Sequence, residues 1–368
     1  MMIHRTLGRT GLQVSPLGFG AMRLPMIGKG ADATVDRDKA IAMIHRAFSA
    51  GVNYIDTAVG YCKQESQQVV GQALKGWRDR VVVSTKNHYY GDNEKEWWTN
   101  LENSLQRLDV DTIDIYNHHG ISWDKYANHV QPLMHRWMLK AQAQGLIRHI
   151  ATSFHDNADA LRKIVDSGYV SVVTVQYNLL DRSLEDAIAH AQAQNVGVVV
   201  MGPVGGGRLG VPSDVLSSLV PGVVRVPELA LRFVLANPNV TLALSGMSTM
   251  EQVAENVAVA ADPMPLSGAD HQAIAQHLER LKQMADLYCT GCGYCKPCPN
   301  EVDIPEVFGL FNMGRVYGLW DEAKRRYGHV TRQGHGSDKC AQCGHCLDKC
   351  PQHIAIMDRL EEAHAALQ

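Results

Sequence analysis

Short apolar runs alternate with longer amphipathic stretches along the chain, up to about residue 260. The runs are rich in β-branched residues and only a few residues long, as is typical of strands buried in a parallel sheet. They lie at residues 14–20, 52–56, 80–85, 112–117, 146–153, 171–178, 196–202 and 240–246, with the first run the weakest. Between them, stretches such as residues 36–50, 94–108 and 183–195 place apolar positions at helical spacing.

This alternation predicts an α/β fold in which eight parallel strands and their helices close into a (β/α)8 TIM barrel. An open doubly wound sheet is the alternative, but it needs a glycine-rich fingerprint after an early strand. The segment GFGAMRLP at residues 18–25 does not provide one. Six residues fall at or just beyond the carboxyl ends of predicted strands: Asp56, Lys86, His119, Ser153, Gln176 and Gly202. A barrel gathers these ends on one face, where barrel proteins build their sites.

The composition narrows the class of protein. The chain has 368 residues, more than one core usually organises, which predicts a large domain followed by a small one. Hydrophobic residues make up 45% and charged residues 20%, the balance of a soluble globular protein. Basic and acidic side chains number 35 and 38, so the charge does not indicate a nucleic acid partner. Because no apolar run reaches the roughly 18–20 residues that cross a bilayer, we expect no membrane association.

The N-terminal segment contains neither the apolar core of a signal peptide nor a twin-arginine signal. We therefore expect a cytoplasmic protein, in which a reducing environment keeps cysteines available for metal binding. Only Cys62 precedes Cys289, and we expect it to be a packing residue rather than a nucleophile. Residues 267–288 have helical spacing and predict a helix that closes the barrel and leads to the first clustered cysteine.

Four chemically complementary side chains lie at or near three strand ends: Asp56, Tyr61, Lys86 and His119. A free tyrosine titrates near pH ~10, but a nearby ammonium lowers that pKa and makes proton donation to a carbonyl easier. The lysine needs a carboxylate partner to stay charged where water is partly excluded, and a histidine can orient the carbonyl oxygen. Each residue alone has an ordinary explanation, as a helix cap, a surface aromatic, a rim charge or a loop histidine. Their combination predicts a proton-donating catalytic site.

The segments around these residues resemble the aldo/keto reductase superfamily, from residue 3 to about residue 262. The similarity lies in LGRTGLQVSPLGFGAMRLP, GVNYIDTAVGY, STK and DTIDIYNHH. It implies that Tyr61 is the general acid and that Lys86 and Asp56 tune it. It also implies that His119 orients the substrate. His119 rather than His118 matches the family tetrad, because it holds the last position of the strand-four motif.

The same resemblance implies that a nicotinamide dinucleotide lies across the barrel mouth. The residues that match or flank its binding positions are Gly20, Ser153, Gln176, Met201, Gly202, Arg208, Gly246, Gln252 and Asn256. Ser153 and Gln176 match residues that hold the carboxamide. Residues 201–210 form a glycine-rich loop, and residues 245–256 match the loop for the adenosine phosphate. Exposed backbone N–H groups at a helix N-terminus suit such a phosphate.

Three of these positions depart from the family pattern. Met201 replaces an aromatic residue that stacks on the nicotinamide in many members. Gly246 and Gln252 replace the lysine and arginine that clamp a 2′-phosphate, although Arg208 could pair with a phosphate. NADP(H) and NAD(H) therefore both stay open, and FMN is a further alternative.

Eight cysteines form two compact runs, Cys289, Cys292, Cys295 and Cys298 followed by Cys340, Cys343, Cys346 and Cys350. The second run has the spacing of bacterial ferredoxins, and the first is one residue shorter before its last cysteine. In two-cluster ferredoxins the fourth cysteine of each run ligates the other cluster. We therefore predict two [4Fe–4S] clusters, the first completed by Cys350 and the second by Cys298. A pair of zinc sites is the alternative, but zinc ribbons use two separated C-x2-C pairs.

Together, these features resemble the subgroup of aldo/keto reductases with a C-terminal ferredoxin-like domain. We expect a barrel over residues 1–286 and a small α-helical iron–sulfur domain over residues 287–368. The expected reaction is the nicotinamide-dependent reduction of a small carbonyl compound, or the oxidation of the alcohol. Residues 86–98, 118–126 and 207–218 would select the substrate, and their aromatic residues favour an amphipathic or ring-bearing one.

Two other roles are alternatives. In one, substrate electrons pass through the clusters to a ferredoxin-like electron-transfer partner. That route requires a flavin, because nicotinamide transfers two electrons at once and each cluster accepts one. In the other, the clusters act as a redox sensor on an inactive barrel.

Overall fold

The computed structural model describes residues 2–28, 32–210, 213, 216, 220, 223, 225–262, 267–268, 270, 272, 274–276, 279, 289, 295–350 and 354–368, without the side chains of residues 206–208 and 316. The chain divides into two compact units. The first contains Met1–Gly206 and Ala230–Pro265, and the second contains Gly207–Leu229 and Leu266–Gln368.

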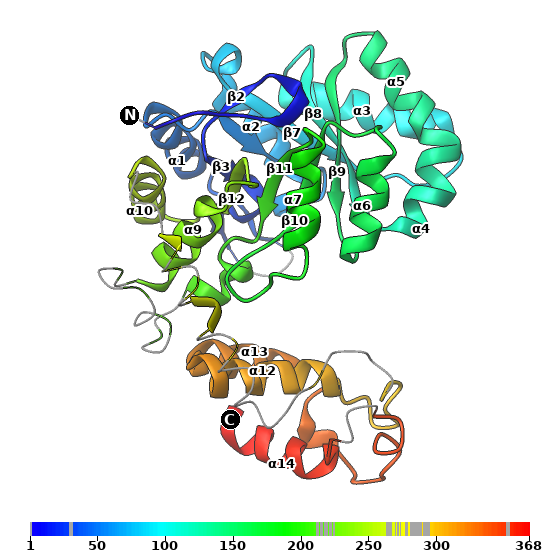
Figure 1. The fold of residues 1–368 in the computed structure, drawn as a ribbon, viewed down its shortest axis with the longest axis vertical. Helices are drawn as coiled ribbons and strands as arrows, with labels where there is room; N and C mark the ends of the chain where they lie inside the picture. Colours follow the sequence, from blue (N-terminus) through cyan, green and yellow to red (C-terminus); the bar gives the residue numbers. More distant parts are fainter. Residues whose placement is uncertain are drawn as a thin grey trace. The chain divides into compact units, whose positions relative to one another are not determined.

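Eight parallel strands close into a barrel in the first unit (Figure 1). They are β3 (Leu17–Gly20), β6 (Tyr54–Asp56), β7 (Val82–Asn87), β8 (Ile113–Ile121), β9 (Ile147–Phe154), β10 (Val172–Gln176), β11 (Gly197–Met201) and β12 (Leu242–Gly246). Each pairs with the next of them along the chain, and β12 closes the ring on β3, where Gly246 pairs with Gly20. Every strand overlaps its predicted apolar run. The predicted (β/α)8 barrel is confirmed, and the open sheet is excluded.

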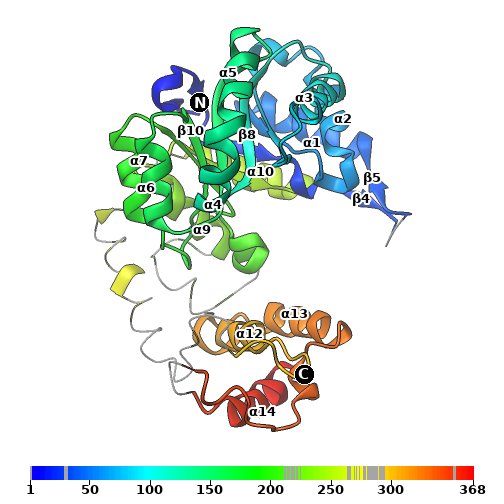
Figure 2. The same cartoon turned by 90° about the vertical axis from the view of Figure 1, so that its right-hand side faces the viewer.

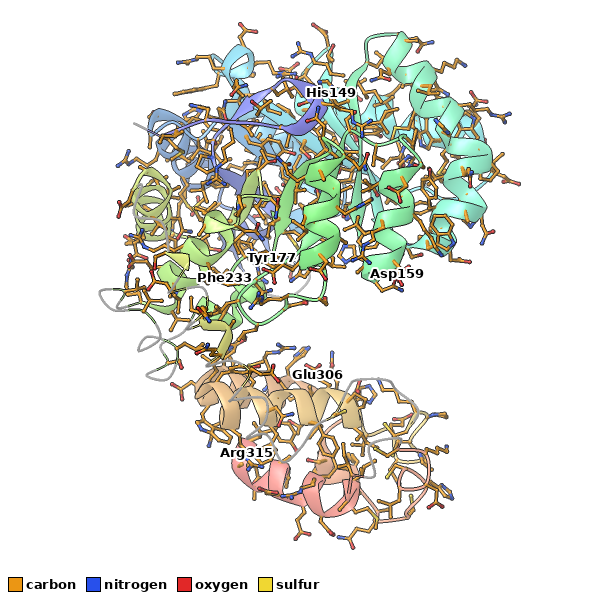
Figure 3. All side chains as sticks on the ribbon, viewed as in Figure 1. His149, Asp159, Tyr177, Phe233, Glu306 and Arg315 are labelled. Atoms are coloured by element: carbon orange, nitrogen blue, oxygen red, sulfur yellow. The ribbon has the colours of Figure 1, made fainter. Side chains whose placement is uncertain are left out.

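Helices surround these strands, as Figures 1 and 2 show from two sides. They are α1 (Arg37–Ser49), α2 (Ser66–Leu74), α3 (Glu94–Leu108), α5 (His135–Ala143), α6 (Ala158–Asp166), α7 (Glu185–Ala193), α9 (Val226–Ala236) and α10 (Met250–Ala261). The side chains of Asp36, Asn93 and Asn157 accept backbone N–H bonds at the starts of α1, α3 and α6, which explains where these helices begin. Stacked rings of Tyr177 and Phe233, 5.6 Å apart between centres, pack α9 beside the end of β10 (Figure 3).

Shorter elements connect these parts. They are η2 (Ala21–Arg23), β4 (Met26–Ile27), β5 (Thr34–Val35), η4 (Tyr61–Gln64), η5 (Arg78–Arg80), α4 (Trp123–Lys125), the π-helix η6 (Tyr126–Met134) and η7 (Gly205–Gly210). Several of them follow the carboxyl ends of barrel strands, so they form the rim around the predicted site.

An N-terminal hairpin covers the opposite end of the barrel. Its strands β1 (Arg5–Thr6) and β2 (Gln13–Val14) pair antiparallel and are joined through η1 (Gly8–Thr10). Leu7 is fully buried in the core cluster that lines this end of the barrel. Gly8 has a φ of +49° and touches the backbone of Gly197, so a side chain would not fit there. The site therefore has to be built at the other end.

The second unit is helical in its described part. It contains α12 (Ile304–Tyr317), α13 (Trp320–Arg332), η8 (Ser337–Lys339) and α14 (Ile356–Leu367), and α12 packs against both α13 and α14. Gly318 ends α12 in the left-handed conformation at φ 67°. The Tyr327 hydroxyl lies 2.7 Å from Ser337 Oγ and 2.5 Å from His364 Nδ1, which ties α13, η8 and α14 together. A helical C-terminal region was expected, and this expectation is confirmed.

Two predicted features lie largely or wholly outside the described residues. The structure describes only scattered residues of the helix predicted for residues 267–288, and it does not describe Cys292. Among the described residues, no helix is both long and apolar enough to cross a membrane.

Candidate active site and cysteine pocket

Four side chains predicted to act together meet at the mouth of the barrel. Asp56 is the last residue of β6, Lys86 lies in β7, His119 lies in β8, and Tyr61 opens η4. Lys86 Nζ lies 2.5 Å from Asp56 Oδ1 and 4.8 Å from the centre of the Tyr61 ring. The Tyr61 and His119 rings meet edge to face, with centres 6.1 Å apart. The structure thus places an ammonium between a carboxylate and a phenol, with an imidazole beside the phenol.

Burial and charge set the protonation states of Lys86 and Tyr61. Burial by itself lowers the pKa of Lys86, but Asp56 and Tyr61 outweigh it, so this pKa lies above its usual value. Burial raises the pKa of Tyr61, and the Lys86 ammonium offsets only part of that effect. The sequence led us to expect a lowered tyrosine pKa; in the structure, burial is the larger effect. Tyr61 is therefore a protonated acid at neutral pH, and Lys86 is a cation.

The two adjacent histidines have different surroundings. Burial, together with Lys86 and other nearby basic groups, lowers the pKa of His119 to about 4, so its imidazole is neutral at physiological pH. The His118 ring is buried, and its Nε2 lies 3.0 Å from the Tyr169 hydroxyl. His119 faces Tyr61, whereas His118 belongs to the packing between β8 and its covering helices.

Supporting residues that the sequence analysis did not single out hold Asp56 in place. Ser84 Oγ donates to Asp56 Oδ2 at 2.8 Å, and Asn117 Nδ2 donates to Ser84 Oγ at 3.1 Å. Lys86 Nζ also donates to the Thr57 carbonyl at 2.9 Å. The only sequence signal for Ser84 and Asn117 was a polar residue within an otherwise apolar strand. Such a residue in a barrel interior needs a partner, and here Ser84 finds Asp56 while Asn117 finds Ser84.

The backbone after Tyr61 is unusual. Cys62, Lys63 and Gln64 have φ values of 48°, 55° and 71°, a left-handed conformation that non-glycine residues rarely adopt in succession. Cys62 Sγ lies 3.4 Å from the Met22 carbonyl oxygen, and burial raises the pKa of this thiol. Cys62 therefore packs against the loop after β3 as a protonated thiol.

Two predicted carboxamide ligands have unused polar groups. Gln176 ends β10, and Ser153 pairs in register with Thr174, two residues earlier in β10. Within the described part of the chain, neither the Ser153 hydroxyl nor the Gln176 carboxamide makes a hydrogen bond. Met201 pairs with Gln176 from the neighbouring strand and is partly exposed. Polar groups without partners at the ends of adjacent strands fit the carboxamide of a nicotinamide.

The turn after β11 is held by the neighbouring loop. Gly202 has a φ of +66° and accepts a bond from Asn178 Nδ2 at 3.2 Å. Any side chain on Gly202 would collide with Gln176, so glycine keeps room for that carboxamide. Arg208 lies in η7, and its side chain is outside the described atoms.

The predicted phosphate loop forms the start of α10. Gln252 Oε1 accepts a bond from the backbone N–H of Ser248 at 2.8 Å, and Asn256 Nδ2 donates to Ser245 Oγ at 2.9 Å. Gln252 and Asn256 thus brace the loop. Gly20 and Gly246 are register partners on adjacent strands, and neither presents a side chain toward the loop.

Arg23 is a nearby residue that the sequence analysis did not select. A Cβ on Gly246 would lie 3.2 Å from Arg23 Cδ, so the arginine occupies the space that the missing side chain leaves. The Arg23 carbonyl accepts a bond from Ser248 Oγ at 2.7 Å. The methylene groups of the Arg23 side chain therefore lie against the loop predicted to bind phosphate. Arg23 belongs to the segment GFGAMRLP, but its contact with the predicted phosphate loop could not be predicted, because the two segments lie more than 200 positions apart in the sequence.

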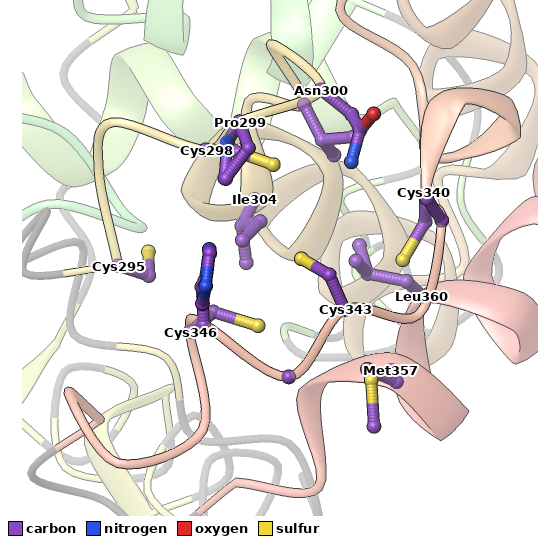
Figure 4. A pocket seen from close by; sticks show the side chains of 14 residues that line it. Cys295, Cys298, Pro299, Asn300, Ile304, Cys340, Cys343, Cys346, Met357 and Leu360 are labelled. Atoms are coloured by element: carbon purple, nitrogen blue, oxygen red, sulfur yellow. The ribbon is translucent and has the colours of Figure 1, made fainter.

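Five cysteines line one pocket in the second unit (Figure 4). They are Cys295, Cys298, Cys340, Cys343 and Cys346, and apolar side chains such as Ile304 and Leu360 complete the lining. Cys295 and Cys298 come from the first run and share the pocket with three cysteines of the second, although the sequence assigned only Cys298 to that cluster. Burial raises the pKa of Cys346, and repulsion from Cys340, Cys298 and Cys343 adds to it, which shows how close these thiols are.

The arrangement of these thiols fits a polynuclear cluster. Among the described residues, no three His, Cys, Asp or Glu side chains converge on one metal-ion position. The thiols of the pocket instead surround a shared space, as the corners of an iron–sulfur cube require. Cys289 and Cys350 do not line this pocket, and the first predicted set is incomplete because Cys292 is outside the described residues.

The parallel barrel, the four residues at its mouth and the cysteine pocket define an oxidoreductase with a cysteine-rich accessory region. Residues 16–211 match the family model described as "Aldo/keto reductase family", and residues 288–355 match the one described as "4Fe-4S dicluster domain". The chain therefore belongs to the aldo/keto reductase family, and its C-terminal region is a 4Fe–4S domain.

Curated relatives and solved structures agree with this assignment. L-galactose dehydrogenase of Arabidopsis thaliana is 29% identical over 77% of this chain and 95% of its own length. NADH-specific methylglyoxal reductase of Escherichia coli is 28% identical over 75% of this chain and 98% of its own. The holo form of aldo-keto reductase AKR11C1 from Bacillus halodurans gives a TM-score of 0.65 at 29% identity, over 75% of this chain and 96% of that one. A Klebsiella pneumoniae aldo/keto reductase in complex with NADP and acetate gives 0.62 at 26% identity, over 75% and 95%.

Proposed function

We propose that this protein reduces a carbonyl compound, or oxidises the corresponding alcohol, with Tyr61 as the general acid or base. The observation that carries the proposal is the position of Lys86, 2.5 Å from Asp56 and 4.8 Å from the Tyr61 ring. Family membership supports the reaction class. The complex of the Klebsiella relative with NADP supports a nicotinamide cofactor.

Each residue has a distinct role in this mechanism. A nicotinamide, when bound, would supply the hydride to the carbonyl carbon, and Tyr61 would give its phenolic proton to the carbonyl oxygen. Lys86 stabilises the phenolate left behind, and Asp56 keeps Lys86 charged. Neutral His119 donates a hydrogen bond to the carbonyl oxygen and so orients it. Ser153 and Gln176 would hold the carboxamide and thus fix the ring beside the substrate.

The test is Tyr61→Phe in the anaerobically purified protein. We expect kcat for aldehyde reduction to fall by about 10²–10⁴-fold, because the proton donor is lost. Dinucleotide affinity should be unchanged. Tyr54→Phe is the matched control, since Tyr54 is fully buried in the core cluster at the end of the barrel opposite the site. Wild-type turnover by Tyr61→Phe would contradict the proposal.

We propose that the dinucleotide places its adenosine phosphates at the N-terminus of α10, with Arg23 as the cation that Gly246 and Gln252 do not supply. Residues 245–256 contain no lysine or arginine. Hydrogen bonds with its own backbone and Thr249 lower the pKa of Glu251, which keeps a carboxylate at this helix start. A 2′-phosphate would have to overcome this negative charge.

Titration of wild type and Arg23→Ala with NADH and NADPH decides the arrangement. A loss of about tenfold for NADPH alone would place Arg23 at a 2′-phosphate, and an equal loss for both would place it at the pyrophosphate. Unchanged affinity for both would contradict the proposal. Extraction of a yellow fluorescent cofactor would instead favour FMN.

We also propose that the region over residues 287–368, beyond a barrel over residues 1–286, holds two [4Fe–4S] clusters. The first would use Cys289, Cys292, Cys295 and Cys350, and the second Cys298, Cys340, Cys343 and Cys346. The pocket that contains all four thiols of the second set supports the second cluster; Cys295, which lines the same pocket, would have to belong to the first. Such clusters suit the reducing cytoplasm.

Metal analysis tests the cluster count. About eight irons and matching acid-labile sulfide per chain are expected for two clusters, and bound zinc without sulfide would contradict them. Reduction of the clusters by substrate would favour the electron-transfer alternative. Turnover that leaves them unchanged would favour the nicotinamide-only reaction.

A further inference from the structure

We propose that the carbonyl substrate carries an anionic group and that Lys125 binds it; this rests on the proposed reaction and adds the class of substrate. Lys125 ends α4, in the segment that follows β8. Its ammonium donates to the Gly120 carbonyl at 2.9 Å and lies 4.9 Å from the centre of the Tyr90 ring. The cation is therefore held at the residue next to His119.

The surrounding contacts keep this arrangement in place. The Tyr90 hydroxyl donates to the His119 carbonyl at 2.7 Å, which links the loop after β7 to β8. The His155 N–H donates to the Ile121 carbonyl at 2.8 Å, which links β8 to the segment after β9. The segments after β7, β8 and β9 thus converge around His119. The Lys125 ammonium lies among them and contacts the backbone at the end of β8.

The carboxylates near Lys125 have other partners. Asp124, the residue before Lys125, accepts a bond from Asn128 Nδ2 at 2.8 Å. Asp156 accepts a bond from the Trp123 N–H at 2.9 Å. No carboxylate of the described residues lies within ion-pair distance of Lys125, although Lys140 and Lys296 each have one. A half-buried ammonium without a counter-ion favours an anionic ligand.

The Lys86 ammonium adds to the positive potential at this point. Like Lys125, it lies within electrostatic reach of His119. A substrate whose carbonyl oxygen meets Tyr61 and His119 would bring a group a few bonds away toward Lys125. A carboxylate or a phosphate would give the ammonium a counter-ion, whereas a neutral group would not.

Paired substrates test the proposal with the holoenzyme at low salt and fixed pH. The pairs are succinic semialdehyde with pentanal, 4-carboxybenzaldehyde with 4-methylbenzaldehyde, and glyceraldehyde 3-phosphate with glyceraldehyde. We expect kcat/KM to favour an anionic member by at least about tenfold. The first two pairs report a preference for carboxylate, and the third reports one for phosphate. Equal values within all three pairs would overturn the proposal.

Variants of Lys125 assign the preference to this residue. Lys125→Gln keeps a donor for the Gly120 carbonyl and loses the charge, so we expect KM for the anionic member to rise about 10- to 100-fold. KM for the neutral member and both kcat values should change less than about threefold. Lys125→Arg should keep the preference. Lys140→Gln, which removes an exposed charge paired with Glu94, is the control and should leave the ratio unchanged. An unchanged ratio in Lys125→Gln would overturn the assignment.

A binding measurement separates this inference from the proposed reaction. Benzoate and benzamide are titrated into the Tyr61→Phe holoenzyme and followed by tryptophan fluorescence, because Trp123 lies two residues from Lys125. Tighter binding of benzoate that is lost in Lys125→Gln supports the anion site even if carbonyl turnover is never seen. Equal binding of the two ligands overturns the site, whatever the outcome of the turnover assay.

Discussion

At the scale of single residues, the proposed catalytic site depends on a balance between burial and charge. Desolvation raises the pKa of Tyr61, and the adjacent Lys86 ammonium offsets part of that rise. Asp56, itself held by Ser84, keeps this ammonium charged where burial alone would favour its neutral form. The result is an acid that holds its proton across the physiological range and releases it when a carbonyl oxygen becomes basic.

The pH profile of carbonyl reduction should reflect two of these groups. Burial raises the pKa of Tyr61, which must be protonated, so kcat/KM should fall only as pH rises above the ordinary titration range of a tyrosine. His119 must be neutral, and its pKa is about 4, so the acid limb should appear as pH falls toward 4. His119→Gln should remove the acid limb and leave the alkaline one. Visible absorption measured in parallel excludes loss of the clusters, and an acid limb near pH 6.5 would contradict the assignment.

At the scale of structural elements, one buried carboxylate connects three neighbouring strands. Asp114 in β8 accepts a bond from the Val83 N–H of β7 at 2.8 Å. It also pairs at 2.9 Å with Arg78 of η5 and with Arg148 of β9. Because Asp114 is almost fully buried, its loss would leave a backbone donor and two guanidinium groups without their acceptor.

We expect Asp114→Ala to lower the free energy of unfolding by about 2–3 kcal/mol. Both arginines are partly exposed and recover some hydration, so the loss should be below that for a fully buried pair. Urea unfolding followed by circular dichroism under anaerobic conditions measures the change. Asp159→Ala is the control, because its pair with Arg162 is solvent-exposed and contributes at most about 1 kcal/mol. Equal losses in the two variants would contradict the role of Asp114.

The apolar runs predicted every barrel strand, because a strand buried on both faces leaves a continuous signal in the sequence. Tyr61 and Lys86 could likewise be located, since their positions relative to strand ends follow from the barrel itself. The roles of Gln252 and Arg23 could not be predicted. The Gln252 side chain bonds to the backbone of its own loop, and the Arg23 side chain lies beside Gly246 on the neighbouring strand. Such side-chain directions depend on contacts between distant segments that a local pattern does not record.

At the scale of the whole molecule, the cysteine pocket depends on helices that lie outside the ligand runs. Tyr327 bonds to Ser337, three residues before Cys340, and to His364 of α14. Met357 and Leu360 of the same helix line the pocket. The packing of α13 on α14 therefore fixes the position of the second cysteine run.

Tyr327→Phe should weaken this support without removing a ligand. Two hydrogen bonds are lost, and the hydroxyl of Ser337 is left without its partner, so we expect the helical unit to lose about 1–3 kcal/mol. Visible absorption should then decay several-fold faster when the protein is exposed to a chelator or to air. Aldehyde reduction measured before this decay should be unchanged. Tyr89→Phe in the barrel serves as the control, and cluster loss at the same rate in both variants would contradict the prediction.

The Leu7 hairpin covers one end of the barrel, and the predicted site lies at the other end. Under the proposed function, dinucleotide and substrate would share that end, so the partner that lies deeper would have to enter first and leave last. Steady-state kinetics should accordingly follow a compulsory order. In product-inhibition measurements, the oxidised dinucleotide should compete with the reduced one, and the alcohol should compete with neither the reduced dinucleotide nor the carbonyl substrate. A hairpin that covers the opposite end of the barrel would thus determine the order in which ligands reach the reaction centre.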